Sequence, residues 1–313
     1  MDVQEGFDNA APDPFSLFPG SETGEILTDA WGGWHDAGDW DRRTQHIEAS
    51  RKLPELVEIA PDFAEARAAS IPEAGNGIPD LVDEAMWNLD LFRRLQKDDG
   101  GVPGGIESGS HPRYGEGSWN ESLEVYAYAP DIWSSWEYAA GAAKLAHALE
   151  TYDPAAAPIW RESALAAMEW AEARLPTGEL NAILQTSRNV AAAELFRLTG
   201  DGRWHDVYKE SSVYTRDLNE VQWFEHQFEA AFVYARTDAP DIDTGLRDTG
   251  IADIERETTF FELDNTGSPF GFAMNPYAPY GWGNTGQQPN FSADHYARLH
   301  HLTGEQVWLD KMM

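Results

Sequence analysis

The sequence predicts an all-α fold in which helical hairpins close on themselves into a toroid. Apolar residues between Ile78 and Leu95 recur at three- and four-residue spacing, the periodicity of a buried helix face. Few segments alternate in the manner of a strand for more than four residues. A third observation is an internal repeat, because "LTGDGRW" (198–204) returns as "LTGEQVW" (302–308).

Each copy of this repeat is explained by a helix that ends at a left-handed glycine cap, followed by a helix whose tryptophan packs back. Stacked hairpins of this kind form a closed toroid or an open superhelix. An open superhelix repeats with a period near 34–47 residues. The sequence shows no such regular period, which favours the toroid.

The elements are expected in the following order. Residues 1–30 are rich in Pro, Gly and Asp and predict an extended lead-in or the remnant of an upstream segment, before a helical region at 31–313. In the helix expected at 77–96, Pro79 lies at the start, where a missing N–H costs nothing. Further helices are expected at 134–150, which is alanine-rich and suits close packing, and at 160–175, 189–200, 220–236 and 290–304.

Composition limits the function. The 54 acidic residues outnumber the 22 basic ones, for a formal net charge of −32. Nucleic acid and anionic membranes are therefore excluded as partners, because both bind clustered Lys and Arg. The absence of cysteine excludes disulfides and thiolate metal sites. No apolar run approaches the roughly 18 residues of a membrane span. The N-terminus lacks signal-peptide features, so we expect a cytoplasmic protein or a chain that begins after its export signal.

The segment "GGWHDAGDWDRR" (32–43) places two aspartates, Asp36 and Asp39, three residues apart. A calcium loop is one explanation, but the EF-hand template fails because its third position is Gly38 and its twelfth is Ile47. A calcium site of another kind, using Asp41 as well, stays open. So does a turn in which the aspartates cap helices or bond the two following arginines.

A water clamp is the functional interpretation of the pair. Hydrolysis of a glycoside with inversion needs a carboxylate base that activates a water, and a carboxylic acid on the other side of the bond. The small residues at 37 and 38 let the backbone turn tightly, so that Asp36 and Asp39 reach one water. Trp34 would give the sugar ring an aromatic surface, although core packing is the more common role of a single tryptophan.

Four segments of the sequence, this one included, resemble segments of one enzyme family and occur in the same order. "GGWHDAGDWDRR" resembles the signature loop of glycoside hydrolase family 9, the inverting cellulases and related β-glucan hydrolases. "AGNGIPDLVDEAMWNLDLFRRLQKDDGGV" (74–102) resembles the next block of that family. "AAAELFRLTGD" (191–201), and "YGWGNTG" (280–286) followed by "LTGEQVWLD", resemble later segments. The resemblance covers about residues 31–313.

The resemblance implies an (α/α)6 barrel with a cleft at its loop end. It implies Asp39 as the general base and Asp36 as the residue that positions the attacking water. Trp34 and Trp282 would line the cleft. The implied reaction is hydrolysis of β-1,4 bonds in cellulose or a related β-glucan with inversion, and the implied location is secreted or periplasmic.

Two departures from the family pattern modify this expectation. The family's catalytic acid is a glutamate near the end of the domain, and none of Glu225, Glu229, Glu257 or Glu262 has a context that matches it. We therefore expect a barrel incomplete at its C-terminal end, truncated at both ends, with the acid outside this chain and with little activity alone. The second departure is 105–123, where His111, Arg113 and Trp119 would replace the sugar-contacting residues of typical endoglucanases.

Rival interpretations stay open. A non-catalytic carbohydrate-binding protein would use the same cleft without turnover. A sugar epimerase or lyase on an α/α toroid would place histidines at the centre of the cleft, but only His35 adjoins the acidic pair. No cofactor is required by the inverting mechanism, and no metal ligand can be assigned, although a structural calcium is compatible with the family.

Overall fold

The computed structural model describes residues 3–5, 23–34, 44–66, 69–108, 113–116, 120, 122–222, 224–260 and 290–312. The chain forms two compact units, Met1–Ser211 and Ser212–Met313, and each is described by itself. The first unit contains β1 (Val3–Glu5), β2 (Ile26–Leu27), α1 (Gln45–Ile59), α2 (Pro61–Ala66), α3 (Asp80–Leu95), β3 (Ile106–Ser108), β4 (Val125–Ala127), α4 (Ile132–Tyr152), α5 (Ala157–Glu172), α6 (Ala182–Thr199) and α7 (Gly202–Ser211).

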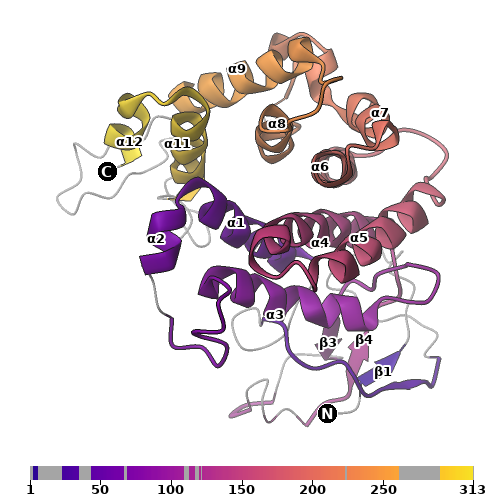
Figure 1. Cartoon of the computed structure of the whole chain (residues 1–313). Helices are drawn as coiled ribbons and strands as arrows, with labels where there is room; N and C mark the ends of the chain where they lie inside the picture. The colour runs from indigo at the N-terminus through magenta and orange to yellow at the C-terminus, as the bar shows by residue number, and fades with distance from the viewer. Residues whose placement is uncertain are drawn as a thin grey trace. The chain divides into compact units, whose positions relative to one another are not determined.

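Three helices form the inner layer of the first unit, because α4 contacts both α1 and α6. A second helix backs each of them: α3 packs on α1, α5 on α4 and α7 on α6 (Figure 1). Close packing depends on small residues in α4. A Cβ added at Gly141 would lie 2.8 Å from Leu89 Cδ2 and 2.9 Å from Ile47 Cγ2, so α4 touches α3 and α1 at this point. The expected role of the alanine-rich segment in close helix contact is confirmed.

Ion pairs connect the inner helices at three levels, of which the middle one is fully buried. Near the helix starts, Arg51 of α1 pairs with Glu137 of α4, which also accepts a hydrogen bond from Ser187 Oγ of α6 at 2.5 Å. Deeper in the layer, Lys144 Nζ lies 2.9 Å from a carboxylate oxygen of both Glu55 and Glu194.

The third level lies further towards the C-terminal ends of α1 and α6, where Arg197 of α6 bonds Glu58 of α1 at 2.9 Å. From the first level to the third, the residue numbers of the paired side chains increase on both α1 and α6. They also increase on α4, which takes part in the first two levels. The three inner helices are therefore parallel. Their first residues therefore lie at the same end of the unit, the end from which Thr44 leads into α1.

A four-stranded sheet of order β2-β1-β4-β3 covers the outer side of α3 (Figure 1). β1 pairs with β4 in parallel and with β2 antiparallel, and β3 pairs with β4 antiparallel. Leu91 and Leu95 of α3 share a buried cluster with Val125 and Ala127 of β4 and with Ala30. This sheet was not predicted, because strands of two or three residues show no detectable alternation.

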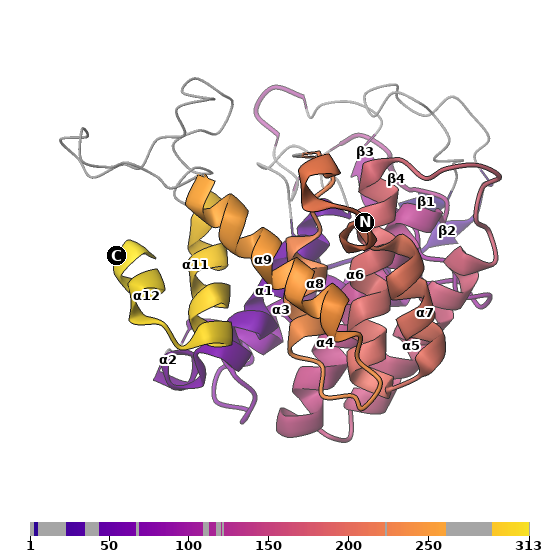
Figure 2. The ribbon, with the colours of Figure 1, turned by 90° about the horizontal axis from the view of Figure 1, so that it is seen from above.

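The second unit contains the 3-10 helices η1 (Val213–Thr215) and η2 (Leu218–Glu220), and the helices α8 (Phe228–Ala235), α9 (Thr244–Phe260), α11 (Asn290–Thr303) and α12 (Gln306–Met312). α8 packs against α9, α9 against α11 and α11 against α12 (Figure 2). The helix expected at 220–236 is wrong at its start. Helix α8 begins after Gln227, whose side chain accepts a hydrogen bond from Val213 N at 2.9 Å and so holds the preceding loop.

The internal repeat has the predicted structure in both copies. Gly200 ends α6 and Gly304 follows α11, with φ angles of 67° and 71° in the left-handed region. Trp204 and Trp308, in the helices that follow, are 1% and 6% exposed. Both helix ends and both buried tryptophans confirm the prediction. Among the described residues, no helix combines the length and the apolar character needed to cross a membrane.

Candidate active site

The segment that leads to the aspartate pair is held against α3 through two glycines with positive φ, Gly32 at 88° and Gly33 at 76°. A Cβ at Gly33 would lie only 2.6 Å from Leu91 Cδ2, so no other residue fits without displacing the helix side chain. Trp87 Nε1 donates a hydrogen bond to the Gly33 carbonyl at 3.2 Å. Glycine is therefore needed here both for backbone conformation and for close approach.

Trp34, the last described residue before the aspartates, is fixed at two points. Its backbone N–H donates to Asn88 Oδ1 at 3.2 Å, and its indole Nε1 donates to Glu84 Oε1 at 2.7 Å. Asn88 is fully buried and donates through Nδ2 to Ser50 Oγ of α1 at 2.8 Å. One turn of α3 thus joins the segment before the aspartates to the inner layer, because Glu84 and Asn88 lie four residues apart on one helix face.

Arg94 fixes the beginning of the same segment. Its guanidinium donates hydrogen bonds to the carbonyl oxygens of Asp29 and Trp31 and lies 3.8 Å from the centroid of the Trp31 ring. Its Nε donates to Asp90 Oδ2 at 2.8 Å, which fixes the direction of the guanidinium. Residues 29–34 are therefore held by side chains of α3 over their whole length, and the backbone that enters the aspartate loop has a defined course.

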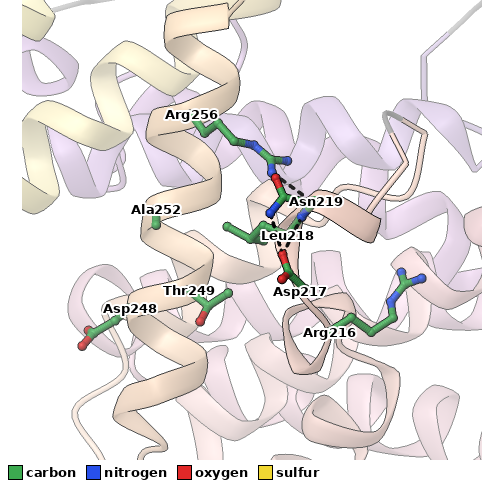
Figure 3. Close-up of a pocket in the computed structure, with 8 residues that line it drawn as sticks. All are labelled: Arg216, Asp217, Leu218, Asn219, Asp248, Thr249, Ala252 and Arg256. Carbon is green, nitrogen blue, oxygen red and sulfur yellow. Dashed lines mark hydrogen bonds between the residues drawn. The ribbon is translucent and has the colours of Figure 1, made fainter.

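A concave site lies in the second unit, between η2 and one face of α9 (Figure 3). Its volume is about 650 Å³, and it is lined by Arg216, Asp217, Leu218, Asn219, Asp248, Thr249, Ala252 and Arg256. The charged lining groups already have partners within the protein. Arg256 bonds the Leu218 carbonyl and Asp253, Asp217 caps η2 by accepting from Asn219, and Arg216 pairs with Glu225 at 3.3 Å. None of the eight lining residues is aromatic, so the pocket offers no surface on which a sugar ring would stack.

Comparison with known proteins decides the family. The family profile described as "Glycosyl hydrolase family 9" matches residues 8–292, which include the two aspartates and the helix α3 that holds residues 29–34. The chain belongs to glycosyl hydrolase family 9. Endoglucanase C of Cellulomonas fimi is 26% identical, aligned over 91% of this chain and 28% of its own length. The xyloglucan-specific endo-beta-1,4-glucanase BoGH9A of Bacteroides ovatus is 33% identical over 28% of this chain and 15% of its own.

Solved structures agree with the family assignment. The crystal structure of a metagenome-derived glycoside hydrolase family 9 endoglucanase matches 99% of this chain with a TM-score of 0.78 at 23% identity. This chain covers 57% of that structure and far less of the two curated relatives. The predicted fold class is confirmed: the chain has the (α/α)6 toroid fold of family 9 over the part that it spans.

Most of the predicted site residues of this family 9 chain lie outside the described residues. They are Asp36, Asp39, His111, Trp119 and Trp282, and their assigned roles stay predictions. Trp34 and Arg113 are described. Trp34 is held by Asn88 and Glu84 of α3, and its place in the cleft wall stays a prediction. Arg113 is exposed, and its backbone N–H donates to Glu116 Oε2 at 3.3 Å. The described residues do not bring Trp34 and Arg113 together.

The structure also identifies residues that sequence reasoning missed. Glu107 of β3 is 2% exposed and accepts a hydrogen bond from the Tyr128 hydroxyl, just after β4. This hydrogen bond joins β3 to the residue that follows β4, and in the sequence Glu107 comes shortly before His111 and Arg113. The sequence around it, "GGIESGS" (104–110), carries no pattern that singles out a buried glutamate. Among the described residues, no group of three His, Asp or Glu side chains is arranged to hold a metal ion. The calcium prediction is untested, because Asp36, Asp39 and Asp41 lie outside them.

Proposed function

We propose that this chain contributes the water-activating part of an inverting β-1,4-glucan hydrolase. Asp39 acts as the general base, Asp36 positions the attacking water, and Trp34 forms part of the cleft wall. The observation that supports the proposal is the attachment of residues 29–34 to α3, which fixes the backbone up to Trp34, two residues before Asp36 in the sequence. Positioning of this kind is what a base needs to hold a water in line with the bond that breaks.

The substrate class is a β-1,4-glucan. Two relatives are named as an endoglucanase and as a xyloglucan-specific endo-β-1,4-glucanase, which supports a glucan backbone for this chain as well. The net charge of −32 fits a neutral polysaccharide better than a polyanion. In this proposal the catalytic acid lies outside residues 1–313, because none of Glu225, Glu229, Glu257 or Glu262 has a context that matches it.

A substrate with an activated leaving group tests this division of roles. A dinitrophenolate leaves without protonation, so dinitrophenyl β-cellobioside needs the base and not the acid. We expect the chain to release dinitrophenolate from this substrate and almost no reducing sugar from β-glucan. The first sugar product, followed by NMR, should be the α-anomer, as inversion requires.

The matched variants are Asp39→Asn, which removes the base, and Asp41→Asn, which removes an aspartate two residues further on in the same loop. Asp39→Asn should lower the release of dinitrophenolate by about 10²–10⁴-fold, whereas Asp41→Asn should stay within about threefold of the unmodified chain. Equal effects of the two substitutions would contradict Asp39 as the base. Binding of cello-oligosaccharide without any turnover would favour the carbohydrate-binding alternative.

A further inference from the structure

Two tryptophans form an exposed aromatic surface beside the segment that enters the aspartate loop. The side chains of Trp31 and Trp87 are 54% and 42% exposed, although tryptophan is normally a largely buried residue. Their ring centroids lie 6.0 Å apart with an angle of 53° between the planes. We call the two rings, together with the Arg94 guanidinium behind Trp31, the tryptophan platform.

The platform is fixed before any ligand arrives. Arg94 stacks on one face of the Trp31 ring and also bonds the Trp31 carbonyl, while about half of the residue's surface stays exposed to solvent. The Trp87 ring is held because its Nε1 donates to the Gly33 carbonyl. A ligand that binds here therefore does not have to order the two side chains, and the entropic cost of binding is reduced.

The chemistry of the platform selects its ligand. Two partly exposed indole rings offer apolar contact, and the chain's large negative charge disfavours any anionic polymer. A neutral glucan chain fits, because the C–H faces of its rings are apolar while its hydroxyls stay in water. Position adds to the argument: Trp31 is five residues before Asp36, so the two lie within about 17 Å of each other even if the backbone is fully extended.

We propose that the tryptophan platform is a second glucan-binding surface that holds the polymer beside the catalytic loop. This inference rests on the proposed function for its choice of ligand. It assigns a role to Trp31 and Trp87 that the sequence pattern did not suggest. The platform would retain a polysaccharide chain near the site between cleavage events, and its contribution should grow with the length of the glucan.

Binding to polymer, measured separately from turnover, tests the proposal. The full chain and its variants are run through native gels that contain soluble β-glucan, and the retardation gives a dissociation constant for each. Trp31→Ala and Trp87→Ala should each weaken binding by at least about tenfold, as loss of an aromatic anchor does. Trp31→Phe keeps an aromatic face and should retain most of the affinity. Phe63→Ala, which removes a 45% exposed aromatic ring from α2, is the matched control and should bind like the unmodified chain.

The outcomes separate this inference from the proposed function. Asp39→Asn should be retarded like the unmodified chain, since the platform does not depend on the base. If Trp31→Ala and Trp87→Ala are retarded as strongly as Phe63→Ala, the platform is wrong even where turnover still depends on Asp39. If the two tryptophan variants instead convert a self-associated chain to a monomer in sizing experiments, the surface is a contact between copies and the proposal is overturned. Far-UV circular dichroism checks that each variant is folded.

Discussion

Replacing Lys144 by methionine should destabilise the first unit strongly. The ammonium group is fully buried in α4 and lies 2.9 Å from carboxylates of Glu55 on α1 and Glu194 on α6. Methionine keeps the length of the side chain but leaves both carboxylates without their cation. Removing one partner of a buried ion pair costs about 3–5 kcal/mol. The free energy of unfolding, from urea denaturation followed by tryptophan fluorescence, should fall by about this amount.

The pH dependence gives a second, independent readout. Burial raises the pKa of Glu194, and Lys144 opposes that shift. A raised pKa means that the folded chain holds this proton more tightly than the unfolded chain, so the stabilising contribution is complete below the ordinary carboxyl pKa and is lost as the pH rises. Without Lys144 the pKa of Glu194 rises further, and the loss of stability with rising pH becomes steeper. Glu194→Gln in the same background should remove this part of the dependence and restore part of the stability.

A surface lysine provides the control. Lys209 pairs with Asp206 at 2.8 Å, but both side chains are exposed, and Lys209→Met should cost no more than about 1 kcal/mol. The reasoning is refuted if Lys144→Met costs as little as Lys209→Met. It is also refuted if the stability of the Lys144→Met chain rises with pH over the range where Glu194 titrates.

Three further predictions concern the site. Gly33→Ala combines a φ of 76° with a contact of 2.6 Å to Leu91 and should lower the free energy of unfolding by about 1–3 kcal/mol, measured by urea denaturation. Glu84→Ala leaves the Trp34 indole N–H without its acceptor and should slow dinitrophenolate release. Glu84→Gln keeps an acceptor and should not slow it. Equal rates of release by the two variants would contradict a positioning role for Glu84. Burial raises the pKa of Asp83, so the ionised carboxylate destabilises the folded chain as the pH rises. Asp83→Asn should therefore increase the stability at neutral pH and flatten the decline of stability with rising pH. Thermal melts from pH 4 to 8 measure both effects.

The helices were largely accessible to sequence reasoning because their signals are local. The apolar spacing that predicted a helix at 77–96 corresponds to α3, Asp80–Leu95, and the alanine-rich segment at 134–150 corresponds to α4, Ile132–Tyr152. The sheet was missed for a physical reason. Strands as short as Ile26–Leu27 are defined by their partners across the sheet, and β1 pairs with a strand more than a hundred residues away.

The candidate site was accessible only in part. The sequence identified Trp34 as a candidate for the cleft wall, and that role stays a prediction. The side chains that hold Trp34 come from α3 and were not anticipated. Glu84 and Asn88 are separated by one helical turn, and this pair was a visible signal in an otherwise amphipathic helix. Lys144 gave another signal, as a single charge within "AAGAAKLAHAL". Its partners on α1 and α6 were not predictable, because they depend on how three helices line up in space.

The three levels of ion pairs also determine how far each helix can slide along its neighbours. Alanine makes much of the surface of α4 smooth, so away from the close contact at Gly141 shape places little restriction on movement along the helix axis. Charge supplies the restriction. If α6 moved by one turn, Arg197 would reach the level of the buried Lys144, and two cations would face each other where a cation and an anion now meet. We therefore expect the ion pairs to select a single alignment of the inner helices along their axes. Close packing by itself would not enforce that alignment.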